Sequence, residues 1–117
     1  SSDLATDALA NWIDNAKQPE DMRFYLAGYL TNTQFIYLVG TGAIPGVAAD
    51  EKADWRLRRM GSLRKAGKIR LEQFWSLSAM IQSGKAAPDL SDYLRGELKE
   101  DRFLQRLRAG AVKGVPR

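Results

Sequence analysis

Apolar side chains recur at intervals of three and four residues along most of the chain, the spacing of one face of an α-helix. The first such stripe predicts a helix over residues 3–16, with Ser2 as its N-cap. A second helix is expected to begin at Pro19, because proline fits the first helical position and the acids that follow complement the positive end of a helix. Its expected apolar face consists of Met22, Tyr25, Leu26, Tyr29 and Leu30.

Residues 35–39 (FIYLV) fit either a buried strand or a turn of helix. Thr31 and Gln34 have the spacing of a capping box, which marks the start of a helix. A lone strand would have no partner elsewhere in this sequence. We therefore predict a helix here.

The glycine-containing stretch at residues 40–46 (GTGAIPG) is the clearest break in the pattern. Asp50 is the expected N-cap of a third helix over residues 51–65. A fourth helix is predicted over residues 69–83, with Gly84 as its stop. Apolar residues cover most of its circumference, which predicts a central helix or a dimer seam built on Leu71, Trp75, Met80 and Ile81.

A fifth helix is predicted from Asp89, its expected cap, to Arg108. Its apolar stripe drifts, which indicates either a bend near Gly96 or a second contact surface. The fold class is therefore all-α, with about five helices in one compact bundle-like domain over residues 1–109. Residues 110–117 are expected to form a flexible tail. A chain of 117 residues is near the usual size of a single domain.

The composition contains neither cysteine nor histidine. This excludes thiol nucleophiles, disulfides, imidazole acid–base catalysis and Cys/His zinc sites. We accordingly expect no enzymatic activity, no cofactor and no metal. The absence of cysteine suits a reducing compartment, so a cytoplasmic location is expected. The acidic start does not resemble a signal peptide, and no apolar run is long enough to span a bilayer.

Three other patterns are better explained by structure than by chemistry. The loop at 40–46 has the spacing G-x-G-x-x-x-G, one residue longer than a dinucleotide fingerprint, and no second strand follows it. Ser62 and Lys65 spell the S-x-x-K of penicillin-recognising enzymes but lie within a basic run. The closely spaced acids fit helix caps and exposed ion pairs better than a metal site.

Charge is distributed unevenly along the chain. Residues 1–51 hold seven acids against Lys17 and Arg23, whereas residues 55–70 hold seven bases and no acid. Clustered bases of this kind suit phosphate contacts. The helix that follows is too apolar to read base edges. A nucleic-acid-binding accessory protein is therefore the alternative function, with a basic patch of Arg56, Arg59, Arg64 and Lys68.

Five aromatic residues crowd the fourteen positions from 24 to 37, and helical spacing does not place all of them on one face. Either all five pack in one core, or some of them face another chain, where tyrosine is favoured. We interpret the surplus as a protein-binding surface and as a reason to expect a homodimer. The candidate residues are Phe24, Tyr25, Tyr29, Phe35 and Tyr37.

In size, helical character and lack of active-site chemistry, the chain resembles the small bacterial anti-activators that bind transcription factors, including those acting on LuxR-type quorum-sensing regulators. The resemblance is one of type, so no functional residue is carried over from it. It implies a non-enzymatic regulator that captures a transcription factor and blocks its dimerisation or DNA binding. The charged halves would accelerate the encounter.

Overall fold

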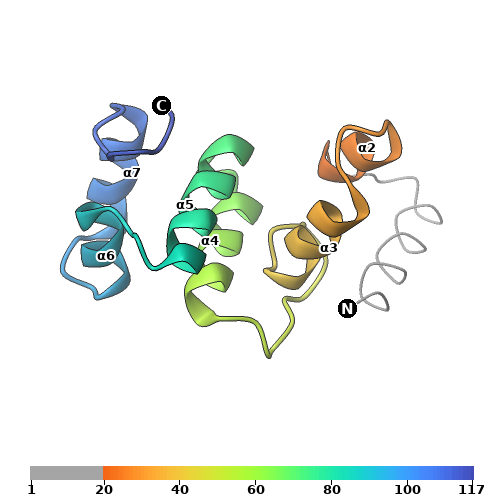
Figure 1. The fold of residues 1–117 in the computed structure, drawn as a ribbon, viewed down its shortest axis with the longest axis horizontal. Helices are drawn as coiled ribbons and strands as arrows, with labels where there is room; N and C mark the ends of the chain where they lie inside the picture. Colours follow the sequence, from red (N-terminus) through yellow and green to blue (C-terminus); the bar gives the residue numbers. More distant parts are fainter. Residues whose placement is uncertain (1–19) are drawn as a thin grey trace. The chain divides into compact units, whose positions relative to one another are not determined.

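The computed structural model describes residues 20–117, and these form six α-helices and no strand (Figure 1). The all-α fold is thus confirmed for the described part, with six helices where about five were expected over the whole chain. The helix predicted over residues 3–16 lies outside the described residues. The six helices are α2 (Glu20–Leu26), α3 (Asn32–Gly40), α4 (Trp55–Lys65), α5 (Leu71–Ser83), α6 (Pro88–Leu94) and α7 (Glu100–Arg108).

The chain divides between Lys65 and Ala66 into two compact units, where we expected a single domain over residues 1–109. The first unit contains α2, α3 and α4, and the second contains α5, α6 and α7. Each unit buries its own set of apolar side chains. In the first these include Met22, Phe35, Leu38, Ile44 and Met60, and in the second Phe74, Leu77, Leu90, Phe103 and Leu107.

Helix α2 ends at Leu26, earlier than the apolar pattern through Leu30 predicts. Gly28, with a φ of 85°, lies just beyond the helix in a conformation that favours glycine. Leu26 and Tyr29 are exposed, whereas Leu30 is buried. The prediction that these side chains share one helical face was wrong, because the chain leaves the helix between them.

Helix α3 confirms the helical interpretation of residues 35–39. The backbone N–H of Gln34 donates to Thr31 Oγ1 at 3.1 Å, and the Thr31 N–H donates to Gln34 Oε1 at 2.9 Å. This is the predicted capping box, and it satisfies two amide donors at the start of the helix.

Helix α4 begins at Trp55, four positions later than predicted. Asp50 instead closes a turn, because its Oδ1 accepts the Lys52 N–H at 2.9 Å. The side chain of Asp54 accepts the Arg56 N–H at 2.9 Å, and its carbonyl accepts the first helical hydrogen bond from Arg58. Asp54 is therefore the residue that caps α4.

A glycine allows α4 to approach the segment that follows α3. A Cβ at Gly61 would collide with the backbone carbonyl of Thr41. The Thr41 side chain donates back into α3, to the carbonyl of Tyr37 at 2.9 Å. Only a residue without a side chain fits at this crossing.

Helix α5 ends as predicted, with Gly84 at a φ of 72°. Its most buried apolar residues are Phe74, Leu77 and Ile81. Trp75 and Met80 are only half-buried. The helix thus provides core residues of the second unit, as predicted for Ile81, whereas Leu71 is half-buried like Trp75 and Met80.

The long helix predicted over residues 89–108 is two helices. Gly96, at a φ of 79°, ends the first of them, and the N–H groups of Glu97 and Leu98 both donate to the carbonyl of Asp92. The expected bend near Gly96 is therefore a complete break. Rings of Tyr93 and Phe103 stack across it, with centroids 4.5 Å apart.

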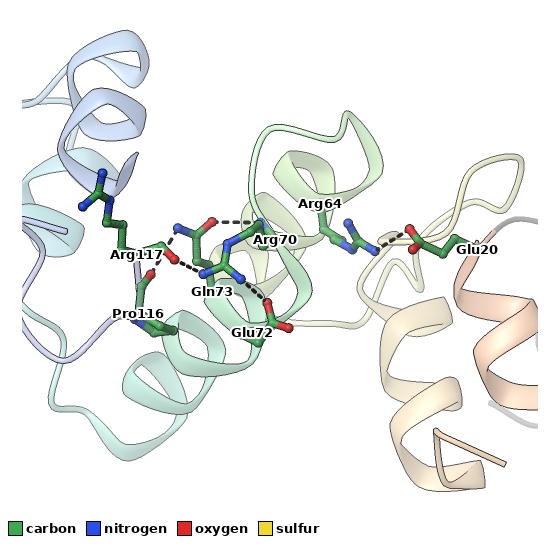
Figure 2. Close-up of polar contacts among 7 residues, drawn as sticks. All are labelled: Glu20, Arg64, Arg70, Glu72, Gln73, Pro116 and Arg117. Carbon is green, nitrogen blue, oxygen red and sulfur yellow. Dashed lines mark hydrogen bonds and ion pairs between the residues drawn. The ribbon is translucent and has the colours of Figure 1, made fainter. Parts of the chain in front are cut away.

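Residues 110–117, expected as a flexible tail, contribute to the interior of the second unit. Val112 and Val115 are 2% and 8% exposed. Figure 2 shows Gln73 of α5 beside this segment, and its Nε2 donates to the Pro116 carbonyl at 3.2 Å. Arg70 also donates to the Arg117 carbonyl. The segment is held by apolar burial and by side chains of α5 and the residue before it.

Candidate functional site

Two of the five aromatic residues singled out from the sequence join α2 to α3. The rings of Tyr25 and Phe35 stack at a centroid distance of 4.4 Å and an interplanar angle of 11°. The Tyr25 hydroxyl donates to Asn32 Oδ1 at 2.5 Å. Phe35 is 1% exposed, so it lies in the interior of the first unit rather than on its surface. Tyr37 lies on α3 in a half-buried position.

The other two candidates lie where α2 ends. The N–H of Gly28 donates to the Tyr25 carbonyl at 3.1 Å, and the N–H of Tyr29 donates to the Phe24 carbonyl at 2.9 Å. This pair of bonds is the Schellman motif, which brings the side chains of its first and last residues together. The rings of Phe24 and Tyr29 accordingly meet edge to face, with centroids 6.3 Å apart.

Tyr29 is nevertheless 79% exposed. Leu26, the last residue of α2, is 55% exposed, and Phe24 is half-buried. We call Phe24, Leu26 and Tyr29 the α2 surface. Its hydrogen-bonded turn fixes the backbone beneath the exposed ring, so the ring is presented without a large loss of backbone freedom on binding.

The residues of the predicted basic patch do not share one environment. Arg64 is turned into the first unit, where its Nη2 lies 2.9 Å from Asp21 Oδ1 and 3.8 Å from Glu20 Oε2. Figure 2 shows this guanidinium directed toward Glu20. Its side chain is 15% exposed, and that of Asp21 is 5% exposed. Arg64 therefore serves an internal ion pair of the first unit.

Two more of the patch residues are paired with carboxylates. Arg56 donates to both oxygens of Asp54, at 3.2 Å and 2.7 Å, and these hydrogen bonds hold the pKa of Asp54 below its usual range. Lys68, which belongs to the second unit, donates to Glu100 at 2.8 Å, and this bond raises the pKa of Lys68. Arg59 is exposed on α4.

Sequence reasoning missed Trp55. Its side chain is 51% exposed at the first position of α4. The signal was present in the sequence, because a tryptophan directly precedes the run of arginines. A strongly apolar residue at a helix start is usually assigned to the core, and periodicity alone does not distinguish the two cases.

The glycine-containing loop at residues 40–46, Lys65 of the S-x-x-K pattern and the closely spaced acids were the other patterns considered in the sequence. In the glycine-containing loop, the N–H groups of Gly42 and Ala43 donate to the carbonyls of Val39 and Leu38, which ends α3. Lys65 Nζ donates to the Val47 carbonyl at 3.2 Å. Within residues 20–117, no group of three or more acidic side chains is placed to hold a metal ion.

Comparison with known proteins gives no relative: no protein-family model, no curated protein and no solved structure matches the chain. Among the described helices, none combines the length and apolar character needed to cross a membrane.

Proposed function

We propose that this chain is a non-enzymatic regulator that captures another protein through the α2 surface. The observation that supports the proposal is the 79% exposure of Tyr29 at a hydrogen-bonded turn. Leu26, at the end of the same helix, is also exposed. Tyrosine combines a broad apolar ring with a polar end, and it is enriched among the residues that dominate binding energy.

The α2 surface is narrower than the five aromatic residues chosen from the sequence. Tyr25 and Phe35 support it from within, because their stacked rings join α2 to the helix that follows. Phe24 contacts the exposed Tyr29 ring edge to face. An apolar groove on the partner would cover Tyr29 and Leu26 and exclude water from them.

The proposed partner is a transcription factor, whose dimerisation or DNA binding would be blocked. This part of the proposal rests on the resemblance in type to small bacterial anti-activators. Such a partner exposes an apolar dimerisation face before it assembles. The α2 surface would bind to that face and cover it.

The test begins with capture from a nuclease-treated lysate and identification of the retained protein. That protein is then purified, and its DNA binding is measured by mobility shift with and without this chain. We expect Tyr29→Ala to weaken capture by about 2 kcal/mol, or roughly 30-fold, and to restore DNA binding. Trp55→Ala is the matched control, because it also removes an exposed aromatic side chain of the first unit.

Three results would overturn the proposal. In the first, Tyr29→Ala retains the captured protein as well as the parent chain does. In the second, the chain does not change DNA binding by that protein. In the third, nuclease treatment removes every partner. Sedimentation equilibrium of the purified chain decides whether a second copy occupies the α2 surface. A dimer that Tyr29→Ala dissociates would replace capture of a different protein with self-association.

A further inference from the structure

The exposed connection between α2 and α3 lacks charge. No charged residue occurs between Arg23 and Asp50, although the chain of 117 residues holds 18 basic and 14 acidic ones. Part of this stretch is uncharged because it is buried, as Phe35, Leu38 and Ile44 are. Burial does not account for positions 26–29 and 31–34, all of which are exposed. Charged side chains usually occupy exposed positions, so their absence here needs another cause.

We call Asn32, Thr33 and Gln34, in the first turn of α3, the uncharged surface. It follows Tyr29 of the α2 surface within five positions of the chain, so one partner can cover both. The central part of a protein interface is depleted of charged residues and enriched in tyrosine. An exposed tyrosine followed by uncharged polar side chains has that composition.

Two amide side chains of the uncharged surface are held in fixed orientations. Asn32 Oδ1 accepts the Tyr25 hydroxyl at 2.5 Å, and Gln34 Oε1 accepts the Thr31 N–H at 2.9 Å. These bonds occupy the carbonyl oxygen of each amide and leave its NH2 group as the donor that it offers to another molecule. A partner that covers the amides therefore has to supply hydrogen-bond acceptors.

The charges of α2 limit which acceptors fit. Glu20 and Asp21 lie at the other end of the helix and face Arg64. Arg23, one turn before Leu26, is exposed and borders the α2 surface. A partner carboxylate buried against the amides would depend on this single cation to compensate its charge. Carbonyl oxygens accept the same hydrogen bonds without burying a charge.

We propose that the partner meets the uncharged surface with an uncharged face of its own. This face is apolar where it covers Tyr29, and it has backbone or amide carbonyl oxygens where it meets Asn32 and Gln34. The inference rests on the proposed function and names the chemistry of the partner. A dimerisation face fits, because homodimer interfaces are more apolar than other protein interfaces.

The test uses the purified protein that the parent chain retains and Tyr29→Ala does not, with the dissociation constant measured by isothermal titration calorimetry. Thr33→Lys and Thr33→Glu should each weaken binding by about 10-fold or more, because either one places an unpaired charge in the interface. Thr33→Gln introduces a side chain of similar size without charge. It should bind within about 3-fold of the parent chain.

Two further variants examine the amides and the neighbouring cation. Gln34→Glu still accepts the Thr31 N–H but replaces the NH2 donor by an anionic oxygen, so it should weaken binding by about 10-fold or more. Arg23→Gln should bind within about 3-fold of the parent chain. Ala79→Lys and Ala79→Glu, exposed on α5 of the second unit, are the matched controls and should leave binding unchanged. Urea unfolding checks that each variant is folded.

Tighter binding by Thr33 variants of one sign and weaker binding by the other would show a charged partner and overturn this proposal alone. Parent-like binding by both charged Thr33 variants, or by Gln34→Glu, would also overturn it. So would a loss of about 10-fold in Arg23→Gln, which would reveal a partner carboxylate, or equal losses in the Ala79 variants. If the parent chain retains no protein, or Tyr29→Ala binds as the parent does, the proposed function fails together with this inference.

Discussion

Asp21 of α2 and Arg64 of α4 form an ion pair with Oδ1 and Nη2 2.9 Å apart, although 43 positions separate them in the sequence. Both side chains are largely withdrawn from water. Arg64 Nε is also buried and has no hydrogen-bond partner among the described residues. The pair therefore joins two helices of the first unit, but at the cost of removing two charges from solvent.

Arg64→Met should destabilise the protein by about 3–5 kcal/mol, because it leaves the carboxylate of Asp21 buried without its cation. Urea unfolding followed by circular dichroism measures this change. The double variant Asp21→Leu with Arg64→Met should recover most of the loss, since no unpaired charge then remains.

Arg56→Gln is the matched control, because it breaks the more exposed pair with Asp54. Its effect on the free energy of unfolding in urea should be much smaller than that of Arg64→Met. A loss below about 1 kcal/mol for Arg64→Met would show that water reaches Asp21 and that the pair behaves like a surface one.

Gly61→Ala should destabilise the first unit by about 1–3 kcal/mol or more, because the added methyl group collides with the Thr41 carbonyl. The effect is opposite to the usual gain when alanine replaces glycine inside a helix. Thermal unfolding measures it. Ser62→Ala, at the next position and exposed, should change stability by no more than about 0.5 kcal/mol.

Val112→Ala should cost about 1–3 kcal/mol, because Val112 is 2% exposed and its methyl groups are buried. Lys113→Ala, exposed at the next position, is the control and should be close to neutral. Amide hydrogen exchange supplies a second readout, with protection expected at the Val115 N–H, which donates to the Val112 carbonyl at 3.1 Å. Rapid exchange with no loss of stability would restore the expectation of a flexible tail.

The features predicted correctly from the sequence are those that local chemistry determines. Thr31 and Gln34 satisfy each other's backbone donors within one helical turn, so their spacing is sufficient evidence for the start of α3. Gly84 stops α5 because a left-handed residue is needed there and glycine adopts it readily. Neither feature depends on contacts with distant residues.

The start of α4 was mispredicted because two residues of the same type were available for one role. Asp50 and Asp54 are both good N-caps, and the chain uses one for a turn and the other for α4. Gly96 is compatible with either a bent helix or a break. Tyr93 stacks on Phe103 and Arg106 donates to Asp89 at 2.6 Å across the break, and both are contacts between helices that the sequence pattern does not reveal.

The candidate functional surfaces were harder to predict from the sequence than the helix boundaries, because they depend on contacts between residues far apart in the chain. The density of charge in residues 56–70 was visible in the sequence, but not the orientation of Arg64 toward an acid of α2. Likewise the crowding of aromatic residues was visible in the sequence, but not which of these rings are buried or that α2 ends before Tyr29. Tyr29, just beyond that end, is exposed, whereas Phe35 of α3 is buried.

Asp54 should make the stability of α4 depend on pH below about 4. The hydrogen bonds from the side chain and then the backbone of Arg56 hold its pKa below the usual value, so the folded state favours the charged form. The contribution is fully present above the unfolded-state pKa of about 3.9 and is lost as the pH falls through the lower folded-state pKa.

We expect Asp54→Asn to lower the melting temperature slightly at pH 6, and the difference from the parent chain to shrink between pH 4 and pH 2. In an Arg56→Gln background the same substitution should have a smaller effect at pH 6, because the guanidinium that favours the carboxylate is gone. A difference that stays constant or widens in acid would mean that the charge of Asp54 does not stabilise the start of α4.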